Sequence, residues 1–203
     1  MLAKRFNVRV TAIDVHQPFL DQLGRSAQAA GLSELIVTRR ASMTALECPP
    51  ESVDLIWCEG AIYIVGFQAG LRLWRPLLRP RGLAVVSECS WLTGSPPAEA
   101  AAFFKAAYPD MAGVEQNIAR ATAEGYDVFD YFLLPQQAWW DEYYTPLQER
   151  IALLRHRAAD NPELAAVLAE TEGEITVFSR FGDSYGYVFY LMRKGDRDPF
   201  GKA

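Results

Sequence analysis

Two carboxylates stand where apolar segments of the chain stop. The run Val53–Cys58 is apolar, β-branched and aromatic, which predicts a buried strand, and Glu59-Gly60 ends it. A further predicted strand, Leu83–Ser87, runs directly into Glu88. A carboxylate and a glycine at the end of a parallel strand are typical of a ligand crevice in an open α/β sheet. The alternative is that Glu59 simply leaves the core for water and that Gly60 makes the turn.

The elements that must position these carboxylates alternate along the first half of the chain. Strands are predicted at Val8–Asp14 and Leu35–Thr38 as well as at the two segments above, and helical spacing predicts helices at Pro18–Ala30 and Phe67–Leu78. This alternation is typical of a parallel sheet built from right-handed crossovers. The arginines at the end of the second helix are interpreted as its solvated face: Arg72, Arg75, Arg79 and Arg81.

The second half of the chain has a different rhythm. Helices are predicted from Pro96-Pro97 to Tyr108 and from Gly113 to Glu124, then a strand at Tyr126–Leu134. A long aromatic-rich helical stretch, Gln136–Ala159, is expected to be interrupted at Pro146, and a further helix at Asn161–Thr171. The last strand, Tyr185–Met192, is too apolar for a sheet edge. We therefore expect it to run antiparallel between the strands at Leu83 and Tyr126.

Composition excludes several functional classes. The 203 residues are half hydrophobic, which is enough for the core of one domain spanning 1–203. The net charge of -5 argues against binding to nucleic acid or to an anionic membrane. Three cysteines form no CxxC pair and the two histidines are far apart, so no metal site is expected. Without a signal peptide or a long apolar run, the expected location is cytoplasmic.

Three motifs in a fixed order resemble a known family. They are Trp57-x-Glu59-Gly60-Ala61-Ile62-Tyr63, Ser87-Glu88-x-Ser90-Trp91 and Tyr185-Gly186-Tyr187-Val188-Phe189-Tyr190. Together with the strand that ends in Asp14, they resemble the class I S-adenosylmethionine-dependent methyltransferases, and more closely a bacterial small-molecule-type subgroup. The resemblance implies a Rossmann-like, mostly parallel α/β sheet with an antiparallel C-terminal strand. It leaves helical segments at about 95–125 and an aromatic-rich segment at about 136–173 as insertions.

One part of the family pattern is absent from these residues. The family begins with a strand and a glycine-rich loop that precede a helix, and the residues Met1–Phe6 resemble the end of that helix. The absent strand would lie between the strands at Val8 and Val53. Unpaired ladder groups in a core cost roughly 1–3 kcal/mol each. We therefore expect this chain alone to be marginally stable and to bind S-adenosylmethionine weakly.

The resemblance also assigns candidate residues for the cofactor. Asp14 would accept the ribose hydroxyls with Val15 beside it, although a helix-capping role is the alternative and nicotinamide cofactors are held by the same device. Ser42 and Met43 would lie at the adenine edge, where many relatives carry an acidic residue. A hydroxyl-stabilised turn is the alternative for Ser42. Glu59 and Gly60 would approach the methionine end of the cofactor.

A second set of residues would face the methyl acceptor. Tyr63 and Trp91 follow the strand ends, while Trp139 and Tyr143 are one helical turn apart and would stack as part of an aromatic lid. The alternative for these rings is ordinary core packing. The candidate catalytic residues are Glu59, Glu88 and Tyr63. A general base is needed only for an acceptor that carries a proton, and the two glutamates are the candidates for that base.

The leading functional hypothesis is methyl transfer to a small-molecule acceptor of unspecified chemistry, with a homodimer left open. An NAD(P)-dependent oxidoreductase shares the acidic strand end, but it does not predict the two final strands as an antiparallel edge. A non-catalytic binding or oligomerisation module derived from the same fold is the third hypothesis, and the absent glycine-rich loop favours it.

Overall fold

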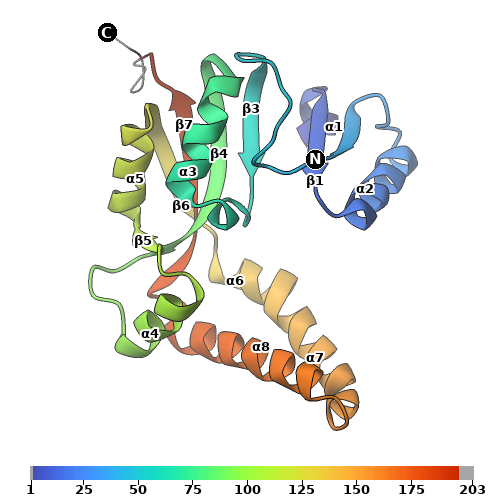
Figure 1. The fold of residues 1–203 in the computed structure, drawn as a ribbon, viewed down its shortest axis with the longest axis vertical. Coiled ribbons are helices and arrows are strands. Elements are labelled where there is room, and N and C mark those ends of the chain that lie inside the picture. The colour runs from blue at the N-terminus through green and yellow to red at the C-terminus, as the bar shows by residue number, and fades with distance from the viewer. Residues whose placement is uncertain (1, 197–203) are drawn as a thin grey trace. The chain divides into compact units, whose positions relative to one another are not determined.

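A computed structural model describes residues 2–196 of the chain. The chain divides into two compact units, Met1–Pro49 and Pro50–Ala203, and each unit holds its own sheet (Figure 1). The expectation of a single domain stays a prediction. The polar tail beyond Asp196 lies outside the described residues.

Unit 1 is a βαβ arrangement preceded by the short helix α1 (Leu2–Phe6). Strand β1 (Val10–Asp14) leads into helix α2 (Gln17–Ala29), which has a proline in its first turn, and strand β2 (Ile36–Arg40) returns parallel to β1. Proline is favoured there because its missing N–H has no helical partner in any case. The two strands pair in register from Val10 with Ile36 to Asp14 with Arg40, so their carboxyl ends meet at one edge.

Unit 2 is organised around a sheet with the strand order β3-β4-β7-β6. Strand β3 (Val53–Cys58) runs parallel to β4 (Leu78–Trp91), which is antiparallel to β7 (Tyr185–Lys194). Strand β6 (Tyr126–Leu133) lies antiparallel on the other side of β7, and the short β5 (Ala112–Gly113) pairs with the end of β4. The predicted α/β fold with an antiparallel, internal C-terminal strand is confirmed.

The predicted helix Phe67–Leu78 is shorter than expected. Helix α3 spans Phe67–Trp74, a single 3-10 turn follows at Arg75–Leu77, and Leu78 already belongs to β4. Pro76 lacks the amide that would continue the helix, which explains the early end. Arg75 is also buried, and not on a solvated face: its guanidinium donates to the carbonyl oxygens of Gly125 and Gly195.

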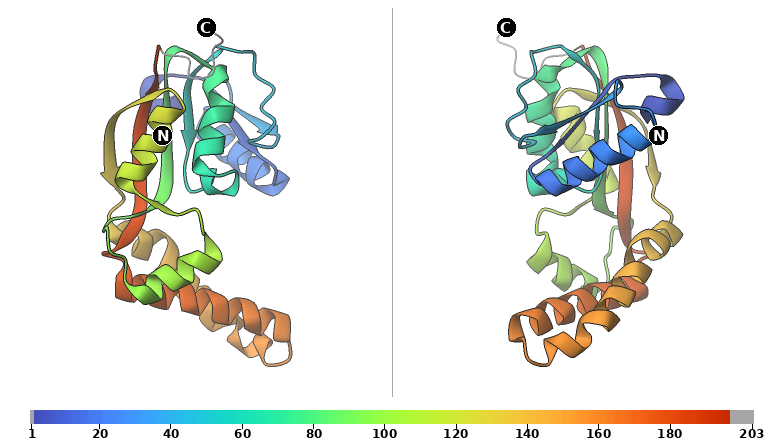
Figure 2. Two further views of the ribbon diagram at one scale, coloured as in Figure 1. Left: turned by 60° about the vertical axis from the view of Figure 1, so that its left-hand side comes forward. Right: turned by 90° about the vertical axis from the view of Figure 1, so that its right-hand side faces the viewer.

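The helices of unit 2 fall into two groups. Helices α4 (Ala98–Ala107) and α5 (Val114–Ala123) follow β4, and α3 and α5 lie side by side on one face of the sheet (Figure 2). After β6 come α6 (Gln136–Trp139), a π-helical turn at Trp140–Tyr144, α7 (Thr145–Ala158) and α8 (Pro162–Phe181).

The predicted interruption at Pro146 is misplaced. Pro146 lies in the first turn of α7, where proline is tolerated, and the irregular segment is the π-helical turn that precedes it. Helix α8 also continues beyond the predicted end at Thr171, as far as Phe181, because Ile175 and Phe178 extend its buried face. Helices α7 and α8 pack against each other as a hairpin (Figures 1 and 2).

A buried polar cluster fixes β4, β7 and α5 to one another. The Tyr190 hydroxyl lies 2.9 Å from the Ser90 Oγ, and the Asn117 amide nitrogen donates to both, at 3.1 Å to Ser90 and 3.3 Å to Tyr190. All three residues are buried. Because a buried polar group without a partner costs free energy, this cluster specifies one register of the three elements.

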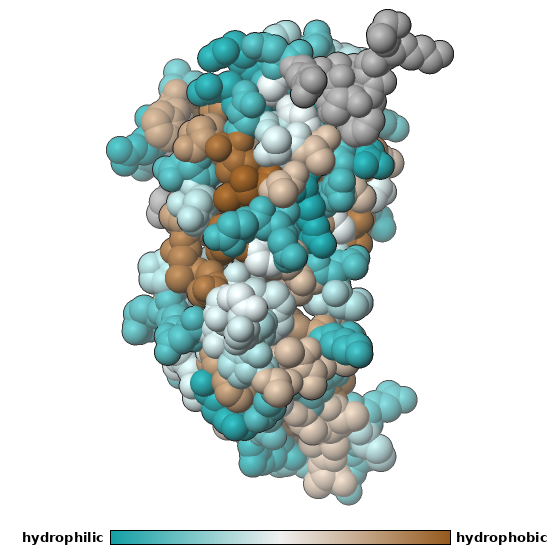
Figure 3. Space-filling view, turned by 90° about the vertical axis from the view of Figure 1, so that its left-hand side faces the viewer, coloured by the Kyte–Doolittle hydropathy of each residue, from teal (hydrophilic) through white to brown (hydrophobic). Residues whose placement is uncertain are grey.

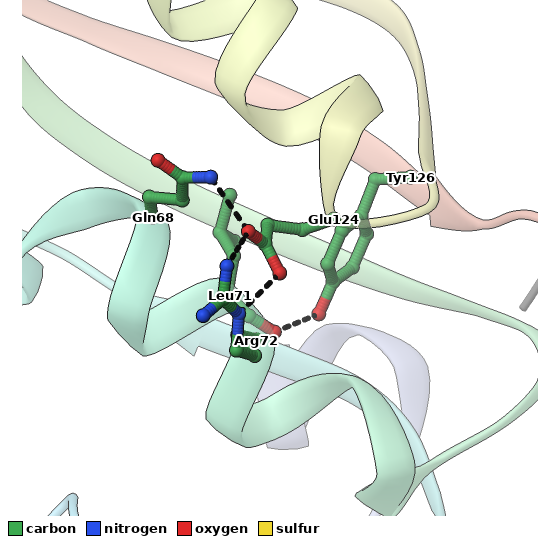
Figure 4. Close-up of polar contacts among 5 residues, drawn as sticks. All are labelled: Gln68, Leu71, Arg72, Glu124 and Tyr126. Carbon is green, nitrogen blue, oxygen red and sulfur yellow. Dashed lines mark hydrogen bonds and ion pairs between the residues drawn. The ribbon is translucent and has the colours of Figure 1, made fainter. Parts of the chain in front are cut away.

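A second polar contact joins helix α3 to the end of α5 (Figure 4). The Glu124 carboxylate accepts hydrogen bonds from Gln68 at 2.7 Å and from Arg72 Nε and Nη2 at 2.9 and 2.7 Å. The Tyr126 hydroxyl donates to the Leu71 carbonyl beside them. The hydrogen bonds from Arg72 lower the pKa of Glu124, whose side chain is only 1% exposed.

The sheets of the two units share no strand in the part of the chain that the structure describes. There β1 pairs with β2 alone and β3 pairs with β4 alone. The expected marginal stability and weak cofactor binding remain predictions.

The surface shown in Figure 3 is largely polar, with separate apolar patches. Among residues 2–196, no helix combines the length and the apolar character needed to cross a bilayer. Four exposed large side chains lie on the edge strand β6: Phe129, Tyr131, Phe132 and Leu133. Formation of a homodimer stays a hypothesis.

We predict that Glu124→Ala destabilises the protein by roughly 1.5–3 kcal/mol, the range for hydrogen bonds to a charged group. Urea unfolding followed by circular dichroism measures the change. Glu172→Ala is the matched control, because Glu172 forms an ion pair with Arg155 in which both side chains are exposed, and such pairs contribute about 0–1 kcal/mol. Equal shifts of the two midpoints would contradict a special role for the buried carboxylate.

Candidate functional site

Four of the candidate cofactor residues meet at one edge of unit 1. Asp14 ends β1, and the chain returns past it after β2, where the Ala41 amide donates to the Asp14 carbonyl oxygen. Val15 is 63% exposed at the same edge, and its carbonyl accepts a hydrogen bond from Arg40. The parallel pairing of β1 and β2 therefore brings Asp14 and Val15 to the loop that carries Ser42 and Met43.

The Asp14 carboxylate uses one oxygen locally. Its Oδ1 accepts the His16 amide at 2.7 Å, while helix α2 has no side-chain cap. Asp14 thus forms a turn and does not cap the helix. Within the described residues Oδ2 makes no hydrogen bond, which leaves an acceptor on a half-buried carboxylate at a strand end.

The loop after β2 shows the turn that was the alternative for Ser42. The Thr44 amide donates to Ser42 Oγ at 3.2 Å, and the two side-chain hydroxyls lie 2.7 Å apart. Ser42 therefore stabilises its own loop. Contact of Ser42 and Met43 with an adenine ring stays a prediction.

In unit 2, Glu59 and Gly60 lie at the carboxyl end of β3 as predicted. Glu59 is exposed, and its Oε1 accepts the indole N–H of Trp57. Gly60 has a φ of 58°, a conformation that favours glycine, and its amide donates to Ser87 Oγ at 2.8 Å. A Cβ at residue 60 would lie 3.4 Å from the Tyr187 hydroxyl oxygen, so this turn packs closely against β7.

Glu88 is the carboxylate with the most unusual surroundings. It is 2% exposed, Oε1 accepts a hydrogen bond from the Tyr108 hydroxyl, and Oε2 is buried without a partner among the described residues. Burial raises the pKa of Glu88 to about 7, although the Tyr108 hydrogen bond and the charge of Arg120 act in the opposite direction. A carboxyl group with this pKa exchanges a proton near neutral pH.

Tyr108 is a candidate site residue that no sequence pattern identified. It follows α4, twenty residues from Glu88, and it joins this carboxyl to the surface. Its ring lies 5.9 Å from the Tyr63 ring, and it lines a pocket of about 340 Å³ together with Asp110 and Arg120. The only local signal was a tyrosine before Pro109-Asp110, at the turn that ends a predicted helix.

The predicted aromatic contacts form on the helical side of unit 2. Trp139 and Tyr143 meet edge to face with ring centroids 6.4 Å apart. Trp139 also stacks on Tyr187 at 4.7 Å and on Tyr144 at 5.7 Å, and its indole N–H is buried without a partner among the described residues. Tyr143 is 45% exposed, so only part of this set is core.

Trp91 has a different environment from the other candidate substrate residues. Its ring packs edge to face against Phe104 at 5.4 Å and Tyr185 at 6.0 Å, beside the apolar cluster that holds Phe178. A substrate contact for Trp91 stays a prediction.

Tyr63 connects Glu88 with the aromatic set. Besides its contact with the Tyr108 ring, it adds a minor part to the raised pKa values of Tyr143 and Tyr187. Burial is the main reason why the pKa of Tyr187 is raised, and the nearby groups that add to it include Tyr63, Glu88 and Tyr143. The structure therefore brings Glu88, Tyr108 and Tyr63 together. Tyr187, opposite Cys89 in the register of β4 and β7, lies on the other face of the sheet, where Trp139 stacks on it.

A family model matches the first part of the chain. Residues 1–82 match the family model described as "Methyltransferase domain". A search of curated proteins found no match.

Solved structures match over nearly the whole chain. Escherichia coli YjhP is 23% identical with a TM-score of 0.78, over 94% of this chain and 78% of that chain. A methyltransferase from Geobacter sulfurreducens with S-adenosylhomocysteine is 21% identical with a TM-score of 0.77, over 94% and 77%. A third, from Thiobacillus denitrificans with the same ligand, is 26% identical with a TM-score of 0.73, over 94% and 77%.

These matches agree with the antiparallel β7 between β4 and β6, which an NAD(P)-dependent oxidoreductase does not predict. Its first 82 residues thus match a methyltransferase domain, and the fold of the chain is that of methyltransferases solved with S-adenosylhomocysteine.

Proposed function

We propose that this chain transfers the methyl group of S-adenosylmethionine to a small molecule whose acceptor atom is held near Glu88. The observation that carries the proposal is the half-satisfied carboxyl group: Tyr108 occupies one oxygen, and the other is buried without a partner in the described residues. A buried polar atom of this kind calls for an explanation, and a bound substrate supplies one.

The residues present fit the cofactor in chemical type. Within unit 1, the open oxygen of Asp14 is the acceptor that a ribose hydroxyl needs. When bound, S-adenosylmethionine supplies a methyl group on a positively charged sulfur that is already a good leaving group.

The protein's own contribution is then alignment, exclusion of water and removal of a proton. Glu88 is better suited than Glu59 to take a proton, because its pKa lies near neutrality and it is shielded from water. Tyr108 holds the Glu88 carboxyl group in place. Tyr63, whose ring contacts Tyr108, would bound the acceptor. Glu59, which is exposed and accepts a hydrogen bond from Trp57, would position the acceptor and would not transfer protons.

We infer a small-molecule acceptor from the small number of groups at the candidate site. The rings and carboxylates of unit 2 offer a few convergent groups, which suits a small ligand. A cytoplasmic location and the lack of nucleic-acid or membrane partners remain predictions that rest on net charge and sequence pattern.

We predict that Asp14→Ala weakens binding of S-adenosylhomocysteine by about 1.5–3 kcal/mol, the range for a hydrogen bond to a charged group. Isothermal titration calorimetry measures the change. Asp21→Ala is the control in the same unit, because Asp21 lies on α2 and contacts only Gln17 through an exposed hydrogen bond. Unchanged affinity of Asp14→Ala, with the fold intact by circular dichroism, would remove Asp14 from the cofactor site.

We also predict that methyl transfer rises with pH through about 7, as Glu88 loses its proton and becomes able to accept one. Tyr108→Phe removes a hydrogen bond that lowers the pKa of Glu88, so the pH profile should move to higher pH. Glu88→Gln should lose the inflection together with most of the activity. The measurement is the initial rate of S-adenosylhomocysteine formation from pH 5.5 to 9, about the range that brackets this pKa.

Stability provides an independent check on the same pKa. Because the folded state keeps the Glu88 proton to a higher pH than the unfolded chain does, this group's contribution is full below pH 4.5 and is lost as pH rises to about 7. Glu88→Gln should therefore gain stability relative to the parent between these values. A profile that matches the parent at every pH would show that Glu88 titrates normally.

A further inference from the structure

A pocket of about 340 Å³ lies in unit 2 beside Glu88 and Tyr108. Its walls come from the first turns of α3, from Arg120 on α5, and from Tyr108 and Asp110 in the segment after α4. Pockets that bind small molecules have volumes of about 300–1,000 Å³. This pocket is therefore large enough for a small ligand and too small for a bulky one.

The pocket and the Glu88 side chain lie on the same face of the sheet. Side chains alternate along a strand, so Glu88 shares a face of β4 with Ser90, which accepts a hydrogen bond from Asn117 on α5 at 3.1 Å. Tyr108, in the wall of the pocket, donates to Glu88 Oε1, while Oε2 is buried without a partner among residues 2–196. Tyr108 therefore links the buried carboxyl group to the pocket.

Two arginines line the pocket, and their guanidinium groups are used differently. Arg72 donates from Nε and Nη2 to the two carboxylate oxygens of Glu124 (Figure 4). Arg120 donates only from Nη1, to the Asp110 carbonyl oxygen at 3.1 Å and to Asn117 Oδ1 at 3.2 Å. Within the described part of the chain, its Nε and Nη2 make no hydrogen bond. Arg120 is thus anchored at one nitrogen and keeps open the same pair of donors with which Arg72 binds a carboxylate.

The other charges around the pocket favour an anion that carries one negative charge. Glu124 offsets the charge of Arg72, and solvent screens the exposed carboxylate of Asp110. The start of α3 adds partial positive charge, since Gly66 provides no side-chain cap. Two parallel hydrogen bonds from a guanidinium match the geometry of a carboxylate. A phosphate dianion would leave one charge uncompensated close to Glu88.

We propose that the methyl acceptor is a small monocarboxylic acid whose carboxylate binds Nε and Nη2 of Arg120 in this pocket, with its acceptor group at the open oxygen of Glu88. The inference rests on the proposed function and names the substrate class for the same site. It combines two independent features of one pocket within the described residues: an anchored guanidinium with two open donors, and a link to a buried carboxyl group with an open oxygen.

The proton and electron balance of such a transfer is complete. The acceptor group gives its proton to the Glu88 carboxylate, and its electron pair forms the new bond to the methyl carbon. The carbon–sulfur bond breaks at the same time, and its electrons stay on sulfur, which becomes neutral. The Glu88 proton then passes to solvent, for which Tyr108 and the pocket offer a route. Arg120 keeps its charge throughout, so it binds and orients the acceptor.

Carboxylate binding is tested without the cofactor, because every wall of the pocket belongs to unit 2. The probes are lactate, mercaptoacetate and para-hydroxybenzoate, and each is compared with its neutral amide by calorimetry near neutral pH. We expect at least one acid to bind about tenfold or more tightly than its amide, which is the lower end for hydrogen bonds to a charged group. Equal binding of the acid and the amide in all three pairs would overturn the inference.

Substitution of Arg120 locates the bound carboxylate. Arg120→Gln should reduce the preference for the acid severalfold, and Arg120→Lys should do the same, because lysine keeps the charge but has no planar pair of donors. Arg157→Gln is the matched control, at an exposed arginine on α7, and should leave the preference unchanged. In the parent protein labelled with nitrogen-15 arginine, the acid and not the amide should shift the Arg120 Nε resonance. An unchanged preference in both Arg120 variants would overturn the inference.

Turnover separates this inference from the proposed function. With S-adenosylmethionine present, we expect formation of S-adenosylhomocysteine from one of the three acids and much slower reaction with its amide. A preference for neutral amides in binding would overturn the carboxylate inference, even if one of them is methylated. Binding of acids that depends on Arg120, with no methylation of any acid tested, would instead contradict the proposed function.

Discussion

Strand β4 is hydrogen-bonded on both sides, and the candidate residues of unit 2 depend on that pairing. Its parallel contact with β3 brings Gly60 beside Ser87, and its antiparallel contact with β7 brings Tyr187 opposite Cys89. The Ser90–Tyr190–Asn117 cluster specifies the register, since a shift of one residue would leave buried polar atoms without partners. The position of Glu88 is thus set by the core of the sheet and not by a loop.

This placement explains the chemistry of Glu88. A carboxyl group in the interior resists ionisation, and a single hydrogen bond from Tyr108 offsets only part of that effect. The result is a group that is half ionised near neutral pH and has one oxygen to spare. The buried Glu124 shows the contrast, because Arg72 and Gln68 satisfy its carboxylate and lower its pKa. The pKa values of these two buried glutamates are therefore shifted in opposite directions.

Much of this arrangement could be predicted from the sequence. The apolar run bounded by Glu59-Gly60 identified the end of β3. Glu88 was expected just after a strand, but it lies inside β4, which continues to Trp91. The apolar run Tyr185–Met192 identified an internal strand, because so apolar a run is unsuited to an exposed sheet edge. The pairing of Trp139 with Tyr143 followed from helical spacing, although a π-helical turn intervenes.

The features that the sequence did not predict depend on contacts between distant segments. The hydrogen bond from Tyr108 to Glu88 forms only after α4 folds back, and no local pattern specifies it. Arg75 was assigned to solvent because its helix continued in the periodic pattern, whereas tertiary packing buried it under two carbonyl groups. Pro146 was expected to interrupt the helical stretch, but it lies in the first turn of α7, which accommodates proline. Periodicity thus located the elements, and packing decided which polar side chains became buried.

The most direct test of this account is the ionisation of Glu88 itself. Carbon-13 labelling of the glutamate carboxyl groups, with Glu88→Gln to assign the resonance, allows its titration to be followed by NMR. The account predicts a midpoint near pH 7 for this one carboxyl group. A midpoint at about 4.3, the ordinary value for glutamate, would contradict it, because the carboxyl group would then be solvated and unable to serve as the buried proton acceptor.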